Sequence, residues 1–365
     1  MSVDFFADNR ITSQDINNAN WKSDYHNYTR IQLLTNCIWD DNSTLVDAAR
    51  DNDGLYRKWL SRFSGSINTT INQMKDMGVT YPQDIDWSVL PNDSYMLTVN
   101  FSLDSHLTTR DDTDYYIIEN PMCKDTAFKI PMMRASSWKG YLRWSCVHRL
   151  IQDIHNLNDL NQRDRLIKSR IQLSLLFGNE QGVEVDSARG ETYLDDIFSK
   201  KFGHDSIIQY RKQMKAISSR GMMKGKLHFY PTFFNKINLD IINPHKLETK
   251  SGENPILMEV APRERRQTHG VVLLYAPLCG GSSGTSFTAK SDLLTVVQAL
   301  EELMLIYGFS AKRTSGYGII YPHCKGNIKG PNLAQIMPGV NLRNGNEFAF
   351  RSGFSGLKNA LNIEG

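Results

Sequence analysis

The sequence predicts an α+β fold with the ferredoxin-like order strand, helix, strand, strand, helix, strand, in which two helices cover one face of an antiparallel sheet. Residues 95–103 alternate between apolar and polar side chains, which is typical of a half-buried strand. Residues 136–154 and 293–307 carry apolar side chains at helical spacing, which predicts the two helices. The other three strands are expected at residues 225–230, 271–276 and 318–321.

Polar segments flank this core. Residues 1–92 are rich in Asn and Asp and contain one amphipathic stretch at 54–77, so they are predicted to be an N-terminal helical extension. The core should span residues 93–325. Glycines recur through residues 326–365, which predicts a glycine-rich C-terminal tail that wraps the core or a partner as a loop.

Further elements are expected inside the core. Leu176-Phe177-Gly178 should close an additional helix, because glycine commonly follows a helix C-terminus. Residues 181–222 are polar, charged and without clear periodicity, so they are predicted to be a large insertion. Residues 237–242 and 255–260 are expected to form a projecting hairpin.

Composition limits the classes of function. A chain of 365 residues is too long for one small core, and its net charge of +3 means that any contact with nucleic acid must come from local basic clusters. The five cysteines include no CxxC pair, which favours reduced thiols and argues against a zinc site. Neither a signal-peptide pattern nor an apolar run of about 18 residues is evident, so we expect a cytoplasmic protein with no membrane contact.

A basic loop punctuated by glycine spans residues 308–318 and is suited to a phosphate backbone. Gly308, Gly316 and Gly318 allow positive φ angles and a close approach of backbone N–H groups, while neighbouring side chains supply charge and hydroxyls. The alternative is a helix C-cap glycine followed by an ordinary turn. The predicted binding residues of this loop are Lys312, Arg313, Thr314, Ser315, Gly316 and Tyr317.

The start of the first core helix is a second candidate site. Ser136 or Ser137 should cap this helix, whose free N–H groups and dipole favour a phosphate. Lys139 and Arg143 lie four residues apart and should extend from one helix face. The alternative is an N-cap with two solvated basic side chains. Trp138 and Trp144 are expected in the core, because aromatic residues on helices usually pack.

Several segments in a fixed order resemble motifs of the RAMP superfamily of CRISPR proteins. Residues 129–143 read Lys-Ile-Pro-Met-Met-Arg-Ala-Ser-Ser-Trp-Lys-Gly-Tyr-Leu-Arg, which resembles the family's Ile-Pro-Gly-Ser-Ser-Leu-Lys-Gly-x-Leu-Arg signature, with Arg134 in an insertion. Leu176-Phe177-Gly178 resembles its Leu-Phe-Gly, residues 225–230 resemble its Gly-x-Leu-x-Phe strand, and the loop at 308–318 resembles its C-terminal glycine-rich loop. Residues 240–245 are similar to a feature of Cmr-type subunits.

The resemblance implies a function in a type III CRISPR effector. Subunits of this family form a filament around a guide RNA (crRNA) and hold the matching target RNA beside it. The implied partners are therefore guide RNA, target RNA, other RAMP subunits and the large type III subunit. Met132 stands where the family has a glycine after Ile-Pro, so the turn before the helix must differ.

The acidic loop at residues 104–125 raises the question of catalysis. The family's cleaving subunits carry an aspartate before an x-Pro in this loop, and Glu119 before Asn120-Pro121 resembles that site. A carboxylate at Glu119 would act as a metal ligand and hold Mg²⁺ there. The bound Mg²⁺ would support endoribonuclease cleavage of target RNA. Asp111, Asp112 and Asp114 are the other candidates, and the alternative is a solvated acidic loop.

A different enzyme class is the competing interpretation. A free-standing, metal-independent endonuclease that processes guide RNA would use a histidine as general base, with His228 and His245 as candidates. Cleavage of repeat RNA by the isolated protein in EDTA would distinguish this class, because neither RNA-binding interpretation predicts it.

Overall fold

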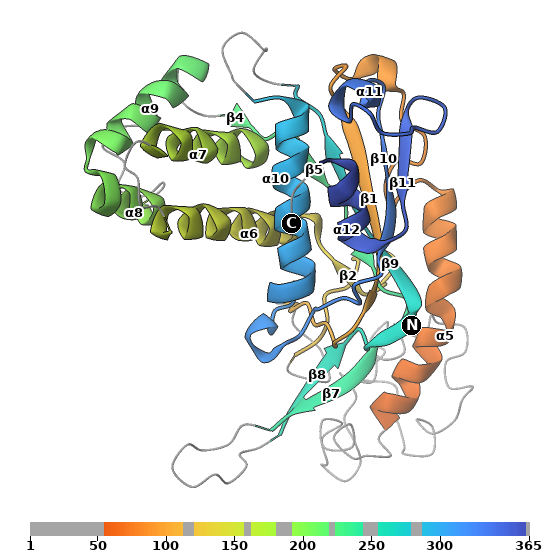
Figure 1. Ribbon diagram of the computed structural model, residues 1–365. Coiled ribbons are helices and arrows are strands. Elements are labelled where there is room, and N and C mark those ends of the chain that lie inside the picture. The colour runs from red at the N-terminus through yellow and green to blue at the C-terminus, as the bar shows by residue number, and fades with distance from the viewer. Residues whose placement is uncertain are drawn as a thin grey trace, which may run out of the picture.

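The structure is a computed structural model that describes residues 55–111, 120–156, 162–179, 192–218, 223–243, 255–278 and 287–362. It is a mixed α+β protein in which helices flank a five-stranded sheet (Figure 1). No helix within these ranges is both long and apolar enough to cross a membrane.

The main sheet has the strand order β11-β10-β1-β9-β5, and all neighbouring strands run antiparallel. Its central strand β1 pairs with β9 on one side and β10 on the other. Along the chain, β1, α6, β5, β9, α10 and β10 follow the predicted alternation of strands and helices. The strands are β1 (Tyr95–Leu103), β5 (Leu227–Phe229), β9 (Glu264–Tyr275), β10 (Lys325–Lys329) and β11 (Glu347–Phe350).

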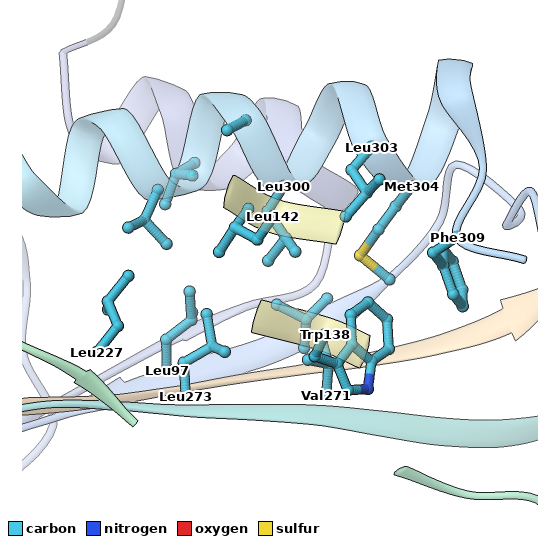
Figure 2. Packing of buried hydrophobic residues seen from close by; sticks show 14 of the residues in the cluster. Leu97, Trp138, Leu142, Leu227, Val271, Leu273, Leu300, Leu303, Met304 and Phe309 are labelled. Atoms are coloured by element: carbon cyan, nitrogen blue, oxygen red, sulfur yellow. The ribbon is translucent and has the colours of Figure 1, made fainter. Parts of the chain in front are cut away.

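Two predicted helices, α6 (Ala135–His155) and α10 (Ala289–Glu302), pack on one face of this sheet, and α5 (Leu55–Asp76) lies on its other side (Figure 1). Cross-strand pairs such as Leu97 with Leu273 place apolar side chains on the helix-covered face. Figure 2 shows this layer packed against apolar side chains of α6, α10 and the following π-helical turn η3 (Leu303–Tyr307). Alternation along β1 and β9 therefore builds the core.

The last core strand lies downstream of its predicted position. Residues 318–321 make a single bridge, Ile320 with Leu103 at the end of β1, and the chain then continues into β10. Only Ile328 of β10 is fully buried, so this strand has no apolar run. Hydrophobicity favoured the wrong segment, because β10 is held mainly by backbone pairing with β1.

The C-terminal tail is not a loop within the described residues. It contains β10, α11 (Leu333–Ile336), β11 and α12 (Gly353–Ala360), with Phe354 and Leu357 in the core. A Cβ at Gly326 would overlap the carbonyl oxygen of Thr98 and the ring of Phe350. The glycine provides space for close packing there, which is why glycine content misled the prediction.

The predicted insertion also contains regular structure. Two helices, α8 (Thr192–Phe202) and α9 (Asp205–Ile217), pack beside α7 (Arg163–Phe177). Gly178 follows α7 with φ of 85°, so the helix end expected at Leu176-Phe177-Gly178 is confirmed. In α9, Ile207, Tyr210 and Met214 are buried at helical spacing, a pattern that the surrounding charged residues obscure in the sequence.

The projecting hairpin is confirmed by β7 (Asn238–Ile242) and β8 (Ile256–Val260), which pair antiparallel and extend away from the sheet (Figure 1). The remaining short elements complete the described fold. They are η1 (Trp87–Val89), β2 (Met132–Met133), β3 (Gly178–Asn179), β4 (Met223–Lys224), β6 (Thr232–Phe233) and η4 (Arg313–Ser315).

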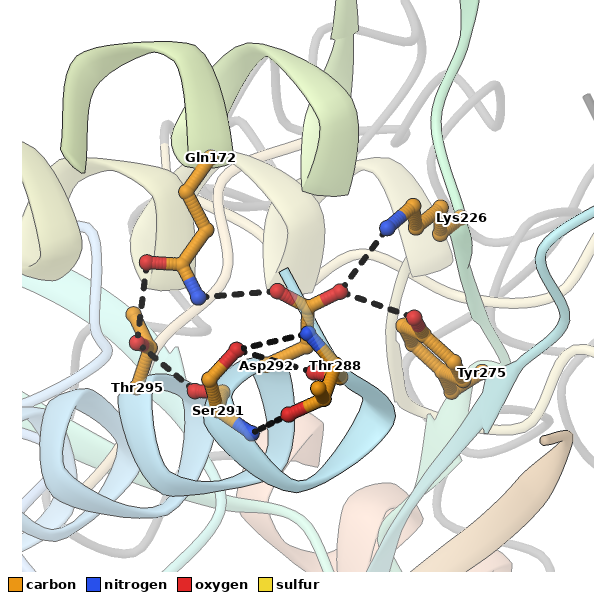
Figure 3. A network of polar contacts seen from close by, with 7 residues as sticks. All are labelled: Gln172, Lys226, Tyr275, Thr288, Ser291, Asp292 and Thr295. Atoms are coloured by element: carbon orange, nitrogen blue, oxygen red, sulfur yellow. Dashed lines mark hydrogen bonds and ion pairs between the residues drawn. The ribbon is translucent and has the colours of Figure 1, made fainter. Parts of the chain in front are cut away.

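A buried polar network ties the helices to the sheet. Asp292, with no exposed surface, accepts hydrogen bonds from Gln172 Nε2 at 2.8 Å, Lys226 Nζ at 3.0 Å and Tyr275 Oη at 2.8 Å (Figure 3). Lys226 Nζ also forms an ion pair with the Asp292 carboxylate. Because these groups are enclosed and satisfied, the network stabilises the junction of α7, β5, β9 and α10.

Candidate nucleic-acid interface

The glycine loop has the backbone geometry that its sequence predicts. Gly308, Gly316 and Gly318 have φ angles of 76°, 80° and 82°. A Cβ at Gly308 would lie 2.5 Å from the carbonyl oxygen of Tyr317, and one at Gly318 would lie 2.9 Å from the backbone nitrogen of Phe309. The two glycines at its base therefore let the incoming and outgoing chains touch.

Hydrogen bonds fix this loop to the segment that follows β1. Ser310 Oγ donates to the carbonyl oxygen of Thr108 at 3.0 Å and accepts from the Thr108 N–H at 3.1 Å. The Gly318 N–H donates to the carbonyl oxygen of His106 at 2.8 Å. The base of the loop is thus held in place before any ligand binds.

Most backbone N–H groups of the loop are already used inside the protein. Arg313 N–H donates to Ser310 O, Ser315 N–H to Lys312 O, and Gly316 N–H to Arg313 O, at 2.9–3.2 Å. The Ala311 N–H donates to Thr108 O at 3.0 Å. These four N–H groups are therefore not available to a phosphate, which contradicts the expectation of a backbone cradle at these residues.

The loop side chains differ in their exposure and in their hydrogen bonds. Thr314, Ser315 and Gly316 are exposed, and Lys312 is half-buried. Tyr317 Oη donates to Asp240 Oδ2 of the hairpin at 2.6 Å. Burial, followed by the hydrogen bond and charge of Asp240, raises the pKa of Tyr317 to about 12. Tyr317 is therefore a neutral structural contact between the loop and the hairpin.

Arg313 reaches from the loop to helix α6. Its guanidinium carbon lies 3.9 Å from the centre of the Trp144 ring, a cation–π contact. Tyr141 is close enough for the positive charge of Arg313 to oppose the rise in tyrosine pKa that burial causes. The structure thus joins the two predicted sites through this stacked arginine.

The start of α6 differs from its predicted cap. The helix begins at Ala135, with Arg134 at the N-cap and no side-chain capping hydrogen bond. Ser136 and Ser137 lie in the first turn, Ser136 exposed and Ser137 half-buried. Capping by either serine is therefore wrong. Met132 and Met133 form β2, which pairs with β6, so a short strand replaces the turn that the missing glycine would allow.

Lys139 and Arg143 lie one turn apart on α6 and differ in exposure. Arg143 is exposed and Lys139 half-buried. Lys139, together with Lys224, adds to the effect of burial in lowering the pKa of His228, which places Lys139 towards β5. Trp144 instead meets the glycine loop. We call the part of α6 from Lys139 to Trp144, together with the glycine loop that Arg313 joins to it, the band.

An aromatic cluster in this band was not predicted. The ring of Trp144 lies 5.1 Å from both His148 and Tyr307, and Tyr307 Oη lies 3.2 Å from His148 Nδ1. Trp138, by contrast, is buried against Phe309, as expected for a core residue. The four-residue spacing of Trp144 and His148 could have indicated a shared helix face.

The acidic loop is described only in part. Asp112, Asp114 and Glu119 lie outside the described residues. The Asp111 side chain is 6% exposed and forms an ion pair with Arg134 Nη2 at 3.3 Å, so it connects the loop to the start of α6. No group of three potential metal-ligating acids, histidines or cysteines occurs within the described ranges.

The histidines proposed for the competing enzyme class are not assembled into a described site. His245 lies outside the described residues. His228 is half-buried, burial is the main cause of its lowered pKa, and its Nε2 has no hydrogen-bond partner among the described residues. That geometry favours a packed histidine on the edge strand.

No family model and no curated protein matches this chain. Solved structures do match. A chain of the type III-B Cmr-beta complex bound to cognate target RNA has a TM-score of 0.37 and 13% identity, with coverage of 83% of this chain and 82% of that chain. A chain of a CRISPR RNA-guided surveillance complex, pre-nicking, has a TM-score of 0.34 and 12% identity, with coverage of 64% and 75%.

Cmr6 from Pyrococcus furiosus is a further structural match, with a TM-score of 0.30 and 16% identity, and the aligned region covers 63% of this chain and 99% of Cmr6. The chain thus resembles subunits of type III CRISPR complexes at low TM-score and low identity.

Proposed function

We propose that this protein is an RNA-binding subunit of a type III CRISPR ribonucleoprotein that holds the guide RNA and positions the complementary target RNA. The main support for this proposal is the contact of Arg313 with Trp144, which joins the glycine loop and α6 into one surface. These two segments also carry the first and last of the ordered RAMP-like motifs. Other RAMP subunits and the large type III subunit are the proposed protein partners.

A ferredoxin-like, RRM-like classification of the core belongs to this proposal. The order β10-β1-β9-β5, with antiparallel neighbours and α6 and α10 on one face, supports it. β11 then adds an edge strand to the four-stranded unit. Fold alone does not imply RNA binding, so we infer RNA binding from the side chains of the band.

The proposed binding surface recognises the RNA backbone. Lys312, Arg313 and Arg143 supply positive charge, and Thr314 and Ser315 supply exposed hydroxyls. Such groups contact phosphate oxygens whatever the base sequence. Stacking on Trp144 orients the Arg313 guanidinium before RNA binds, which favours binding.

The double substitution Lys312→Ala/Arg313→Ala tests the surface. We expect the protein to lose about tenfold in affinity for single-stranded RNA, with little dependence on base sequence. The slope of log affinity against log salt should fall by about 1.4, the value for two lost contacts with single-stranded phosphates. Fluorescence anisotropy across a salt series measures the affinity and the salt slope. In the same assay, Lys139→Glu should also weaken RNA binding.

Lys212→Ala/Lys215→Ala in α9 is the matched control, since it removes two exposed positive charges at a different place. It should leave the salt slope nearly unchanged. If both double variants reduce affinity equally, general charge and not this band binds RNA. Unchanged affinity and slope in the loop variant would remove the loop from the interface.

Cleavage of target RNA by the acidic loop is a separate part of the proposal. Mg²⁺ would need carboxylate ligands there, yet Asp111 is engaged with Arg134 and does not fit that role. Glu119, Asp112 and Asp114 remain the proposed residues. All three lie outside the described part of the chain.

A further inference from the structure

The first residues of β9 bulge out of the main sheet. In the pairing of β1 with β9, Phe101 lies opposite His269 and Leu103 lies opposite Glu264. Residues 265–268 of β9 therefore have a single residue of β1 opposite them. A bulge of this kind redirects side chains and is common beside functional sites. The band described above includes no residue of this bulge.

Two arginines lie beside the ring of Tyr321. The guanidinium carbon of Arg265 is 5.4 Å from the ring centre, and that of Arg263 is 5.8 Å from it, so both make cation–π contacts. Both arginines are exposed, and Tyr321 is half-buried. We call these three residues the Tyr321 cluster. It gathers two positive charges on one aromatic ring at the start of β9.

The two arginines differ in their acidic partners. Arg263 Nη2 forms an ion pair with Asp104 Oδ1 at 2.7 Å, and Arg263 Nε donates to Tyr321 Oη at 3.3 Å. Asp104 therefore balances part of the charge of Arg263 and holds its side chain in place. Arg265 has no acidic partner among the described residues. Its guanidinium is oriented by the Tyr321 ring, while its N–H donors remain open to a ligand.

His106 connects the Tyr321 cluster to the base of the glycine loop. The Arg263 N–H donates to His106 Nδ1 at 2.9 Å. The carbonyl oxygen of His106 accepts from the Gly318 N–H at 2.8 Å, and the His106 ring lies 6.4 Å from the ring of Tyr317. The cluster and the glycine loop are therefore held together as one continuous surface, which a single polyanion could follow.

We propose that the Tyr321 cluster is a second site for the RNA backbone, in which Arg265 binds a phosphate next to those held by the glycine loop. An oriented guanidinium without a carboxylate partner matches the geometry of a phosphate group. Two cations already lie beside the half-buried Tyr321 ring, so we expect no base stacking and no base preference there. That the phosphate belongs to RNA rests on the proposed function.

Arg265→Ala in the full chain tests this site. The affinity for single-stranded RNA at low salt should fall about threefold to fivefold, the usual worth of one exposed charge contact. The slope of log affinity against log salt should fall by about 0.7, the value for one lost contact with a single-stranded phosphate. Oligouridine and oligoadenine should lose the same factor, because backbone contacts carry no sequence information. Fluorescence anisotropy measures the affinities and the slope.

Arg351→Ala is the matched control. Arg351 is an exposed arginine that follows β11, a strand separated from β9 by β10 and β1. Its loss should leave the affinity and the salt slope unchanged. The proposal is overturned if Arg265→Ala binds RNA like the unchanged protein, or if Arg351→Ala loses as much affinity. If Arg265→Ala weakens the binding of poly-glutamate but not of RNA, the cluster contacts an acidic protein surface, which also overturns the proposal.

Two substitutions of Tyr321 test whether its ring orients Arg265. Tyr321→Phe keeps the ring and should bind RNA like the unchanged protein. Tyr321→Leu removes the ring but no charge, so the salt slope should stay the same. The RNA affinity should fall about twofold to threefold, because the freed arginine must then be ordered on binding. Equal affinities of the two folded variants would overturn the role of the ring.

The loop variant Lys312→Ala/Arg313→Ala distinguishes this proposal from the proposed function. If Arg265→Ala weakens RNA binding and the loop variant does not, the Tyr321 cluster binds RNA and the glycine loop is not part of the interface. If only the loop variant weakens binding, the proposed function is supported and the second site is overturned. If neither variant weakens binding, both proposals are overturned.

Discussion

Arg313 has its guanidinium over an indole ring, although a basic residue in a glycine-rich loop would ordinarily sample many rotamers in water. An arginine side chain carries about 2 kcal/mol of rotamer entropy. Stacking on Trp144 restricts it before RNA binds, so less of that entropy remains to be lost on binding. Trp144 is half-buried where it meets the loop, whereas Trp138, six residues earlier, is enclosed in the core.

At the same scale, Asp292→Asn should unfold more easily than the unchanged protein. The substitution leaves the nearly buried ammonium of Lys226 without its counter-charge, and breaking a buried pair in this way typically costs about 3–5 kcal/mol. Urea unfolding followed by circular dichroism measures the loss.

The double variant Asp292→Asn/Lys226→Met is the control for this prediction. Removing both charges replaces the pair with neutral groups and should recover much of the lost stability. If Asp292→Asn alone leaves the unfolding midpoint unchanged, the network in Figure 3 does not stabilise the fold as described.

At the scale of elements, the sequence predicted β1, α6, α10 and the β7–β8 hairpin. In each of them, the spacing of apolar residues in the sequence matches the spacing of buried residues in the structure. Its failures are also physical. β10 has one buried apolar residue and is held by backbone pairing, so its sequence has no apolar pattern. In α9, charged residues lie between the buried ones and obscure the helical spacing. Of the candidate site, the glycine conformations followed from residue type. The stacking of Arg313 on Trp144 did not, because it depends on two segments that meet only in the folded chain.

Gly326→Ala tests the role of glycine within β10. A Cβ there overlaps backbone, which cannot move without disturbing the pairing of β10 with β1, so we expect a loss of about 2–3 kcal/mol in unfolding free energy. Gly65→Ala is the opposite case. Gly65 lies within α5 with no atom near its hypothetical Cβ, and alanine should stabilise that helix by about 0.5–1 kcal/mol. Equal thermal shifts for both variants would contradict this account.

For the whole molecule, the proposed function predicts that a complex containing this chain cuts target RNA at the acidic loop. We expect Glu119→Ala to abolish one Mg²⁺-dependent cut while target binding persists, with Asp112→Ala or Asp114→Ala as weaker contributors. EDTA should abolish the same cut. Labelled target RNA, with each product scored separately, provides the measurement.

Asp111→Asn is the comparison within that loop. Because Asp111 pairs with Arg134 at the start of α6, its loss should lower stability and leave cleavage by the folded complex intact. If every cut survives all four substitutions, the acidic loop is not catalytic and neighbouring subunits do the cutting.

The bond from Tyr317 Oη to Asp240 joins the glycine loop to a hairpin that projects from the body of the protein (Figure 1). A neighbouring molecule that shifts the hairpin must either break this bond or carry Tyr317 with it. A ligand that binds the loop only while this bond is intact would favour the hairpin position seen here, and by linkage a molecule that binds this hairpin position would strengthen binding at the loop by the same factor.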